Sequence, residues 1–278
     1  MRNFKIKNKL LLTENKNQIK NLWLNNFLDD DEKIVDDFLG NVFENKKGVG
    51  AFFNDELVAM ILFLNSKIIF ENKDKRAVYF YAVCTDEKYR NKGIMKSLFS
   101  YAKEKAKEQG FEVCFLVPEN EELFKMYEKF SFERTICYEE KLFTFENGYD
   151  KNTIILLTDF CYKDYKTIRL NASLKTPVVM WSEKEFNFIF NQNRNDVSFI
   201  FSKSGYAIYE KQKDEILVFE FCGNEKEIPD LIFSKETDYK KIRMRVPREA
   251  TKTDFGMTFN LVDSDDDVNS IYFGMPYG

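Results

Sequence analysis

The sequence predicts an α+β protein in which helices flank a mixed sheet, arranged in two domains. A length of 278 residues fits two domains of ordinary size. Two runs without alternation, Ala77 to Cys84 and Glu112 to Val117, are typical of strands buried on both faces. Around these runs, apolar residues recur at helical spacing, which predicts helices between and beside the strands.

The N-terminal half begins with two helical patterns. Residues 16–28 and 31–44 both place apolar side chains on one face, and the second follows an acidic start that suits the helix dipole. Asn54-Asp55-Glu56 then separates the two strands of a predicted hairpin. The remaining elements follow in order: a strand at 77–84, a helix from Ile94 to Gly110, a strand at 112–117, a helix at 123–130 and two short strands within 132–146.

The sequence predicts a linker at 148–152, and the C-terminal half follows it. Ser182 and Glu185 form a capping-box pattern, which predicts the start of a helix. Later elements are strands at 198–201, 206–210 and 216–221, a helical segment at 231–233, a strand at 242–246 and a hairpin of 255–262 with 269–273. This order resembles the first half from its own hairpin onward, so we expect a diverged duplicate with domains 1–147 and 148–278.

Composition restricts the partners and the compartment. A formal net charge of -4 argues against a nucleic acid or an anionic membrane as partner. No apolar run approaches the ~18 residues of a membrane helix, and the first residues lack the features of a signal peptide. The five scattered cysteines are expected to be buried free thiols of a cytoplasmic protein.

Histidine is absent from the sequence. This absence excludes histidine-based nucleophile pairs and the usual zinc motifs, and we expect no metal. Proton transfer near neutral pH must therefore use carboxylates, tyrosine, lysine, cysteine, a chain terminus or water.

The loop Arg90-Asn91-Lys92-Gly93-Ile94-Met95 joins a buried strand to a helix start. A helix start presents unpaired backbone N–H groups, and a glycine lets a phosphate approach them closely. Arg90, Lys92 and Lys96 add positive charge. The Walker and dinucleotide-binding glycine patterns are both missing, so the predicted anion is not a nucleotide held by either motif.

This segment resembles the GNAT superfamily of N-acetyltransferases. Their signature, [QR]-x-x-G-x-[GA] after a buried strand, is similar to Arg90-x-x-Gly93-x-Met95. The run from Asn120 to Glu133 resembles the next element of the family, N-x-x-A-x-x-L-Y-x-K-x-G-F-E. Met95 and Ser131 depart from this pattern, since Gly or Ala is usual at the first position and Gly at the second. Met95 either crowds a pyrophosphate or points inward, and Ser131 must adopt a glycine-like backbone.

The resemblance implies a site for acetyl-CoA, the co-substrate. The strand end at Val83, Cys84 and Thr85 would bind pantetheine, and the amides of Asn91, Lys92, Gly93, Ile94, Met95 and Lys96 would hold the pyrophosphate. Tyr127 occupies the position of the tyrosine that protonates the leaving thiolate, although its apolar stripe also fits core packing. Asn120 is either a helix cap or a CoA contact. Cys84 is expected to be a buried strand residue rather than a nucleophile.

We therefore expect an acetyl-CoA-dependent N-acetyltransferase that acts by direct attack of an amine on the thioester. The acceptor is a small molecule or a peptide, and the resemblance leaves a homodimer open. The alternative is a non-catalytic acyl-CoA-binding or regulatory protein. The second domain lacks the CoA motif and carries an acidic loop at 222–227. It should therefore be a degenerate GNAT-like domain that shapes the acceptor site or supports the structure.

Overall fold

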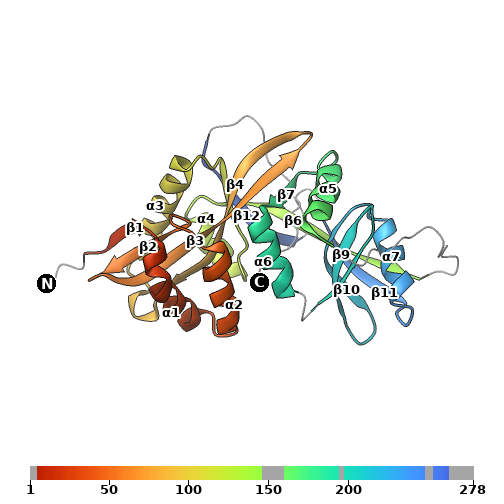
Figure 1. Cartoon of the computed structure of the whole chain (residues 1–278), viewed down its shortest axis with the longest axis horizontal. Coiled ribbons are helices and arrows are strands. Elements are labelled where there is room, and N and C mark those ends of the chain that lie inside the picture. Colours follow the sequence, from red (N-terminus) through yellow and green to blue (C-terminus); the bar gives the residue numbers. More distant parts are fainter. Residues whose placement is uncertain (1–4, 146–159, 194–196, 248–252, 263–278) are drawn as a thin grey trace. The chain divides into compact units, whose positions relative to one another are not determined.

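A computed structural model describes residues 5–145, 160–193, 197–247 and 253–262 (Figure 1). The chain forms two compact units, neither of which is continuous in sequence. Unit 1 contains the described residues up to Lys67, then Lys75–Glu133, and those from Met257 onward. Unit 2 contains Ile68–Asp74 and Arg134–Gly256. The division of roles between 1–147 and 148–278 stays a prediction.

Unit 1 has a mixed sheet with the strand order β1-β2-β3-β4-β5-β12. Its strands are β1 (Lys7–Leu10), β2 (Gly48–Phe53), β3 (Glu56–Phe70), β4 (Lys73–Thr85), β5 (Val113–Leu116) and β12 (Thr253–Asn260). The end of β3 and the first residues of β4 and of β12 belong to unit 2. Its helices are α1 (Lys16–Asn26), α2 (Glu32–Asp37), α3 (Ile94–Glu108) and α4 (Glu121–Glu128). Short turns of 3-10 helix at Thr13–Asn15 and Glu87–Tyr89, and of π-helix at Phe38–Val42, complete the unit.

The β2–β3 hairpin confirms the turn predicted around Asn54 and Asp55. Both residues have positive φ, 50° and 63°. Two successive left-handed residues suit a tight hairpin, because their twist matches that of the flanking strands. Asn and Asp tolerate this backbone better than most residues, and for this reason the sequence predicts a turn here.

Aromatic packing holds helices on both faces of β4. On one face Tyr81 packs against Trp23 of α1 and against Phe38, with ring centroids 5.2 and 5.7 Å apart. On the other face Phe80 packs against Phe63 at 5.2 Å and against Phe99 of α3 at 6.0 Å. Because neighbouring residues of a strand point to opposite faces, the apolar run at 77–84 is buried on both sides.

Strand pairing beside β5 differs from the sequence prediction. The predicted pair of strands within 132–146 is wrong, because the structure has a single strand, β6 (Glu133–Thr144), which belongs to unit 2 apart from its first residue. The neighbour of β5 is β12, which pairs antiparallel to it from Met257↔Leu116 to Asn260↔Val113. Local alternation identifies a strand but not its partner. The second strand of the final predicted hairpin, 269–273, lies outside the described residues.

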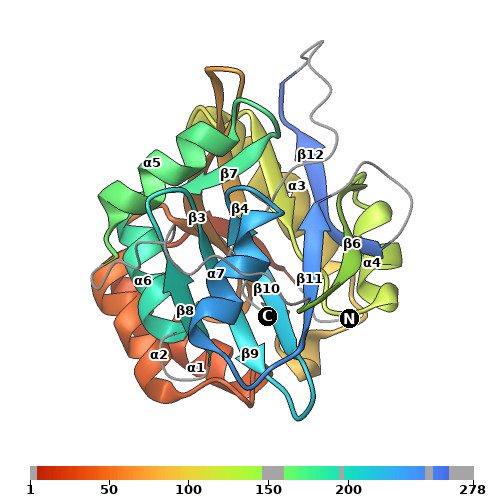
Figure 2. The same ribbon diagram turned by 90° about the vertical axis from the view of Figure 1, so that its right-hand side faces the viewer.

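Unit 2 has a sheet with the strand order β6-β11-β10-β9-β8 (Figure 2). These strands are β6, β8 (Ser198–Phe201), β9 (Tyr206–Lys211), β10 (Ile216–Cys222) and β11 (Lys241–Pro247). A further strand, β7 (Val178–Trp181), pairs with β3, whose end belongs to the same unit. The helices are α5 (Tyr162–Ala172), α6 (Glu183–Asn193) and α7 (Glu227–Lys235).

The order of elements in unit 2 repeats that of unit 1. Strands β8, β9 and β10 are antiparallel neighbours, and α7 then leads to β11, which is parallel to β10. The same sequence of connections runs from β2 through β3, β4 and α3 to β5. Apolar residues of α7, among them Ile228, Leu231 and Ile232, form one buried cluster with Ile216 and Val218 of β10.

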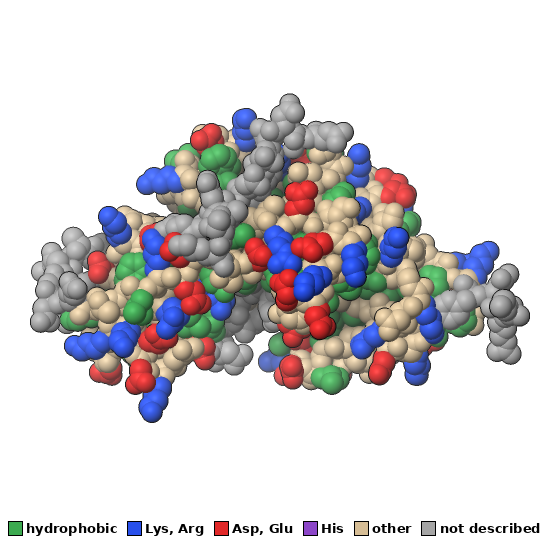
Figure 3. All heavy atoms as spheres, turned by 180° about the vertical axis from the view of Figure 1, so that it is seen from behind, with side chains coloured by type: hydrophobic (Ala, Val, Ile, Leu, Met, Phe, Trp, Pro, Cys, Tyr) green, Lys and Arg blue, Asp and Glu red, His purple; other side chains and the backbone are tan. Residues whose placement is uncertain are grey.

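The structure bears on two expectations drawn from composition, which concern the surface charge and the cysteines. Acidic and basic side chains are interspersed over the face shown in Figure 3. All five cysteines are free, and four are buried, whereas Cys161 is exposed at the start of α5. None of the helices in the described residues has both the length and the apolar character needed to cross a bilayer.

Candidate functional site

The end of β4 extends beyond its partner β5. The two strands pair in parallel from Ala77↔Val113 to Tyr79↔Phe115, yet β4 continues to Thr85. Ala82 has a φ of 47°, a left-handed backbone that interrupts the regular strand. The part of β4 that follows Tyr79 therefore has backbone groups that β5 does not occupy.

The loop after β4 is tied down by its own basic side chains. Arg90 donates from Nε to the carbonyl oxygen of Thr85 at 3.1 Å and from a terminal nitrogen to Asn26 at 3.0 Å. Lys92 donates to the carbonyl oxygen of Lys88 at 2.6 Å. These two side chains hold the loop in place, so the backbone is left to make the contacts with an anion.

The start of α3 presents such a backbone. Asn91 and Gly93 have positive φ, 61° and 72°. A Cβ added at Gly93 would meet no protein atom within 4 Å, so the glycine serves the backbone angle and the space beside it is open. The N–H groups of Gly93, Ile94, Met95 and Lys96 have no acceptor one turn earlier in the helix, which is the arrangement that binds phosphates.

The side chains of this first turn point in different directions. Ile94 is buried, Met95 is half-buried and Lys96 is exposed. The sequence offered two alternatives for Met95: its side chain crowds the pyrophosphate or points inward. The side chain is half-buried, so neither alternative is fully met.

Tyr127 lies on α4 and is almost completely buried, with 6% of its surface exposed. Its ring packs edge-on against Phe99 at 5.6 Å and Phe132 at 6.2 Å. Burial raises the pKa of the phenol well above its usual value, and the nearby thiol of Cys84 raises it further. The phenol therefore keeps its proton at neutral pH and lies within electrostatic reach of the end of β4.

The ends of α4 explain two other positions. Asn120 caps the helix, because its side-chain oxygen accepts a hydrogen bond from the amide of Leu123 at 3.1 Å. Ser131 has a φ of 64°, which is the glycine-like geometry expected from the sequence. The amide of Phe132 donates a hydrogen bond to the carbonyl oxygen of Tyr127 at 3.2 Å, and this bond caps the C-terminal end of the helix.

Cys84 has the properties of a core residue. It is buried, and burial raises the pKa of its thiol far above the ordinary value, against smaller opposing effects from Arg90 and from a backbone hydrogen bond at Met60. A thiolate is therefore disfavoured at neutral pH. Within the described part of the chain, no three acidic or cysteine side chains gather in a way that could hold a metal ion.

Two residues at this site were not expected from the sequence. Tyr79 marks the last pair between β4 and β5, and burial together with the nearby Tyr127 raises the pKa of its phenol. Asn26, at the end of α1, holds Arg90. Neither position carries a sequence signal of its own, since both roles depend on contacts distant in the chain.

The corresponding helix start in unit 2 is closed. The side-chain oxygen of Asn224 accepts a hydrogen bond from the amide of Lys226 at 3.1 Å. Its backbone carbonyl oxygen accepts hydrogen bonds from the amides of Glu227 and Ile228 at 3.0 and 3.2 Å. The first amides of α7 are therefore paired, whereas the space beside Gly93 at the start of α3 is open.

In unit 1, a parallel strand pair separates beside a helix start with open space next to Gly93, and the phenol of Tyr127 is buried nearby. Residues 9–135 match the family model described as an acetyltransferase (GNAT) domain. The chain is therefore similar to a GNAT domain over 127 of its 278 residues. A comparison with curated protein sequences gave no match.

Solved structures share the fold across both units. A conserved protein from Enterococcus faecalis V583, described as a probable N-acyltransferase, gives a TM-score of 0.71 at 12% identity, covering 92% of this chain and 73% of that one. A GCN5-related N-acetyltransferase from Anabaena variabilis gives 0.68 at 13% identity, covering 93% and 73%. Another from Kribbella flavida gives 0.65 at 11% identity, covering 91% and 70%. At these identities the likeness concerns the fold.

Proposed function

We propose that this protein is an acetyl-CoA-dependent N-acetyltransferase that acts on an amine of a small molecule or a peptide. The observation that carries the proposal is the convergence of three features in unit 1. These are the end of β4 beyond its pairing with β5, the open amides at the start of α3, and the buried phenol of Tyr127. We keep the cytoplasmic location expected from the sequence as part of the same proposal.

The backbone would provide most of the donor site. Amides from Asn91 to Lys96 would hold the pyrophosphate, since Gly93 leaves the space beside them open. Backbone groups of Val83, Cys84 and Thr85 would pair with the amides of pantetheine. Arg90 and Lys92 hold the loop and contribute their charge at a distance, and Asn120 acts on the site by capping α4.

The chemistry requires one proton donor and one oxyanion donor. A neutral amine attacks the thioester carbonyl, and a backbone N–H near the end of β4 stabilises the negative oxygen that forms. Collapse of this intermediate breaks the C–S bond, forms the amide and releases a thiolate. Tyr127 gives its proton to that sulfur, and the proton lost by the amine goes to water and returns to the phenol.

Unit 2 would serve as a degenerate GNAT-like domain with an acceptor-site or structural role. Its helix start at α7 has its amides paired by Asn224, which leaves little for a pyrophosphate to bind. We therefore expect one CoA per chain. Calorimetric titration of the intact protein with acetyl-CoA should give a stoichiometry of one, and a value of two would contradict this assignment.

A screen of amines with acetyl-CoA, in which release of the free CoA thiol is followed, tests the whole proposal. Saturable thiol release that depends on both acetyl-CoA and one class of amine is the expected result. If acetyl-CoA binds but no amine class supports turnover, the protein is the non-catalytic acyl-CoA-binding alternative. If acetyl-CoA does not bind at all, both assignments fail.

A further inference from the structure

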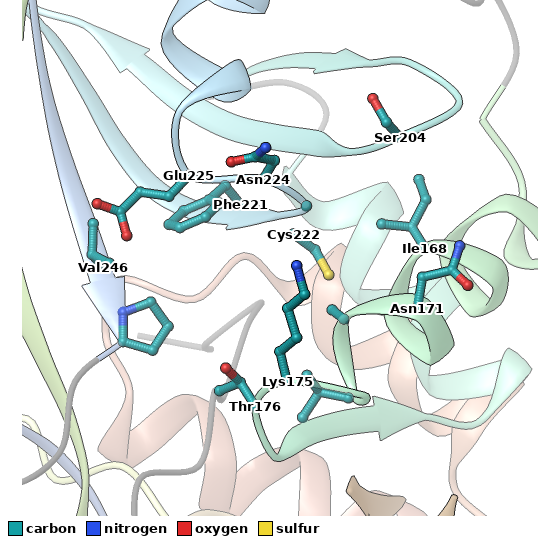
Figure 4. A pocket seen from close by; sticks show the side chains of 14 residues that line it. Ile168, Asn171, Lys175, Thr176, Ser204, Phe221, Cys222, Asn224, Glu225 and Val246 are labelled. Carbon is teal, nitrogen blue, oxygen red and sulfur yellow. The ribbon is translucent and has the colours of Figure 1, made fainter. Parts of the chain in front are cut away.

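Unit 2 contains a pocket that the acetyl-transfer chemistry does not use. It has a volume of about 400 Å³, within the size range of small-molecule sites. All its lining residues belong to unit 2. They come from α5, from the segment that leads into β7 and the first residue of β7, from the β8–β9 turn, from the ends of β10 and β11, and from the loop that follows β10 (Figure 4).

The pocket lies where two parallel strands stop pairing. β10 and β11 pair from Ile216↔Ile242 to Val218↔Met244, while the pocket is lined further along by Phe221 and Cys222 of β10 and by Val246 and Pro247 of β11. The carboxyl ends of parallel strands are a common place for ligand sites, because the connections diverge there and leave a crevice.

A buried polar cluster fixes two walls of the pocket to each other. Arg169 of α5 donates to Glu220 of β10 at 2.9 Å, and Tyr206 donates to the same carboxylate oxygen at 2.6 Å. Arg169 and Glu220 are 0% and 1% exposed. Their neighbours Ile168 and Cys222 line the pocket, so a desolvated ion pair holds α5 against β10 and keeps the cavity rigid.

Close backbone packing builds the rim. A Cβ at Gly205 would lie 2.6 Å from the carbonyl oxygen of Cys222, and one at Gly223 would lie 2.7 Å from that of Ser204. The β8–β9 turn therefore rests directly on the loop that follows β10. Such contact leaves little freedom for the rim to collapse into the pocket.

The charge that faces the pocket is positive. Figure 4 shows the side chain of Lys175 extending into the pocket toward Cys222. Lys175 is an exposed residue, and among the described residues no carboxylate forms an ion pair with it. The other charged lining residue, Glu225, is neutralised by Lys141 at 2.5 Å. Apolar walls with one inward-facing ammonium group favour a ligand with an apolar body and one negative group.

We propose that this pocket binds a small monocarboxylic acid, with its carboxylate on Lys175 and its apolar part between α5 and the ends of β10 and β11. A nucleotide-sized polyphosphate does not fit the same features, because Asn224 already occupies the amides at the start of α7. This proposal does not rest on acetyl transfer in unit 1.

Phenylacetate and phenylacetamide test the proposal, because they have the same shape and differ in charge. The intact protein should bind phenylacetate saturably in calorimetry, and phenylacetamide about tenfold more weakly or worse, since a charge-assisted contact of roughly 1.4 kcal/mol corresponds to a factor of ten. Lys175→Met should bring phenylacetate down to the level of the amide. Lys166→Met, which changes an exposed lysine of α5 outside the pocket, should leave binding unchanged.

A second variant separates this site from the one in unit 1. Ala172→Phe, which places a ring into the lining, should abolish phenylacetate binding, while Gly93→Asp should not affect it. The proposal is overturned if phenylacetate gives no saturable signal up to about 10 mM. It is also overturned if Lys175→Met binds phenylacetate as the parent does, or if a second equivalent of CoA binds and Ala172→Phe removes it.

Discussion

Tyr127 packs in the core of unit 1 and carries the hydroxyl group that we propose as the acid. Its ring is buried against Phe99 and Phe132, so substitution by Phe keeps the contacts and removes only the hydroxyl group. We predict that Tyr127→Phe lowers turnover ~10²- to 10⁴-fold, the usual value of general acid catalysis. CoA affinity and thermal stability should change little. Steady-state assays with the identified amine check this, and near-parental turnover would assign Tyr127 to packing alone.

Lys103 of α3 is partly buried, and its burial should make the stability of the protein depend on pH. Its ammonium group donates to the carbonyl of Phe130 and lies 3.3 Å from the ring centroid of Phe259. Partial burial lowers its pKa from 10.5 to about 8. Between these values the unfolded chain binds more protons than the folded one, so stability should rise with pH in this window.

The expected result concerns the difference in unfolding free energy between the parent and Lys103→Met. The free energy of unfolding of the parent, relative to that of Lys103→Met, should move in favour of the parent as the pH rises from about 8 toward 10. Denaturant melts at several pH values measure it, and the comparison cancels the other titrating groups. Lys96→Met, at an exposed position of the same helix, is the control and should show no such trend. A flat difference for Lys103→Met would show that the lysine is not desolvated.

At the scale of the element, the two helix starts differ although their connections are the same. The space beside Gly93 at the start of α3 is open, while the first amides of α7 are paired by Asn224. We predict that Gly93→Asp abolishes acetyl-CoA binding, because a carboxylate would repel the pyrophosphate and a φ of 72° is unfavourable for most side chains.

Gly40→Asp is the matched control for this variant. Gly40 also has no protein atom within 4 Å of an added Cβ, and it has no positive φ, so the same charge is added elsewhere without strain. Calorimetry should show normal CoA affinity for Gly40→Asp and none for Gly93→Asp. Equal affinity in the two variants would place the donor somewhere other than the start of α3.

The elements themselves were largely predictable from the sequence, because their signals are local. The Asn54-Asp55 turn, the pattern of Ser182 with Glu185 and the stripe that ends at Gly110 all lie within one turn or one strand. β1, α5 and β7 were missed. At the site, the position of Ser131 was correctly expected to need a left-handed backbone, while the contacts of Tyr79 and Asn26 depend on distant residues and were not predictable.

At the scale of the whole molecule, the order in which strands pair is the part that the sequence did not reveal. The register and the partner of a strand depend on which faces of all the strands and helices are buried together. The alternation of apolar and polar residues within one strand does not identify the neighbouring strand. β12 joins β5 although Phe259 and Cys114 are 145 residues apart in the chain. The first domain read from sequence therefore lacks a strand that completes its sheet.

This topology gives the last prediction. A fragment of residues 1–147 would expose the edge of β5 and remove Phe259 from Lys103 and Phe132. An unpaired apolar edge strand promotes aggregation, so we expect the fragment to be poorly soluble and to bind no acetyl-CoA. The same fragment, extended through a flexible linker by residues 253–262, should recover solubility and binding, because it restores the partner of β5. Gel filtration and calorimetry on both fragments and on the intact protein make the comparison. If residues 1–147 alone stay monomeric and bind acetyl-CoA as tightly as the intact protein, β12 is dispensable and the sequence-based division at 147 describes an independent domain.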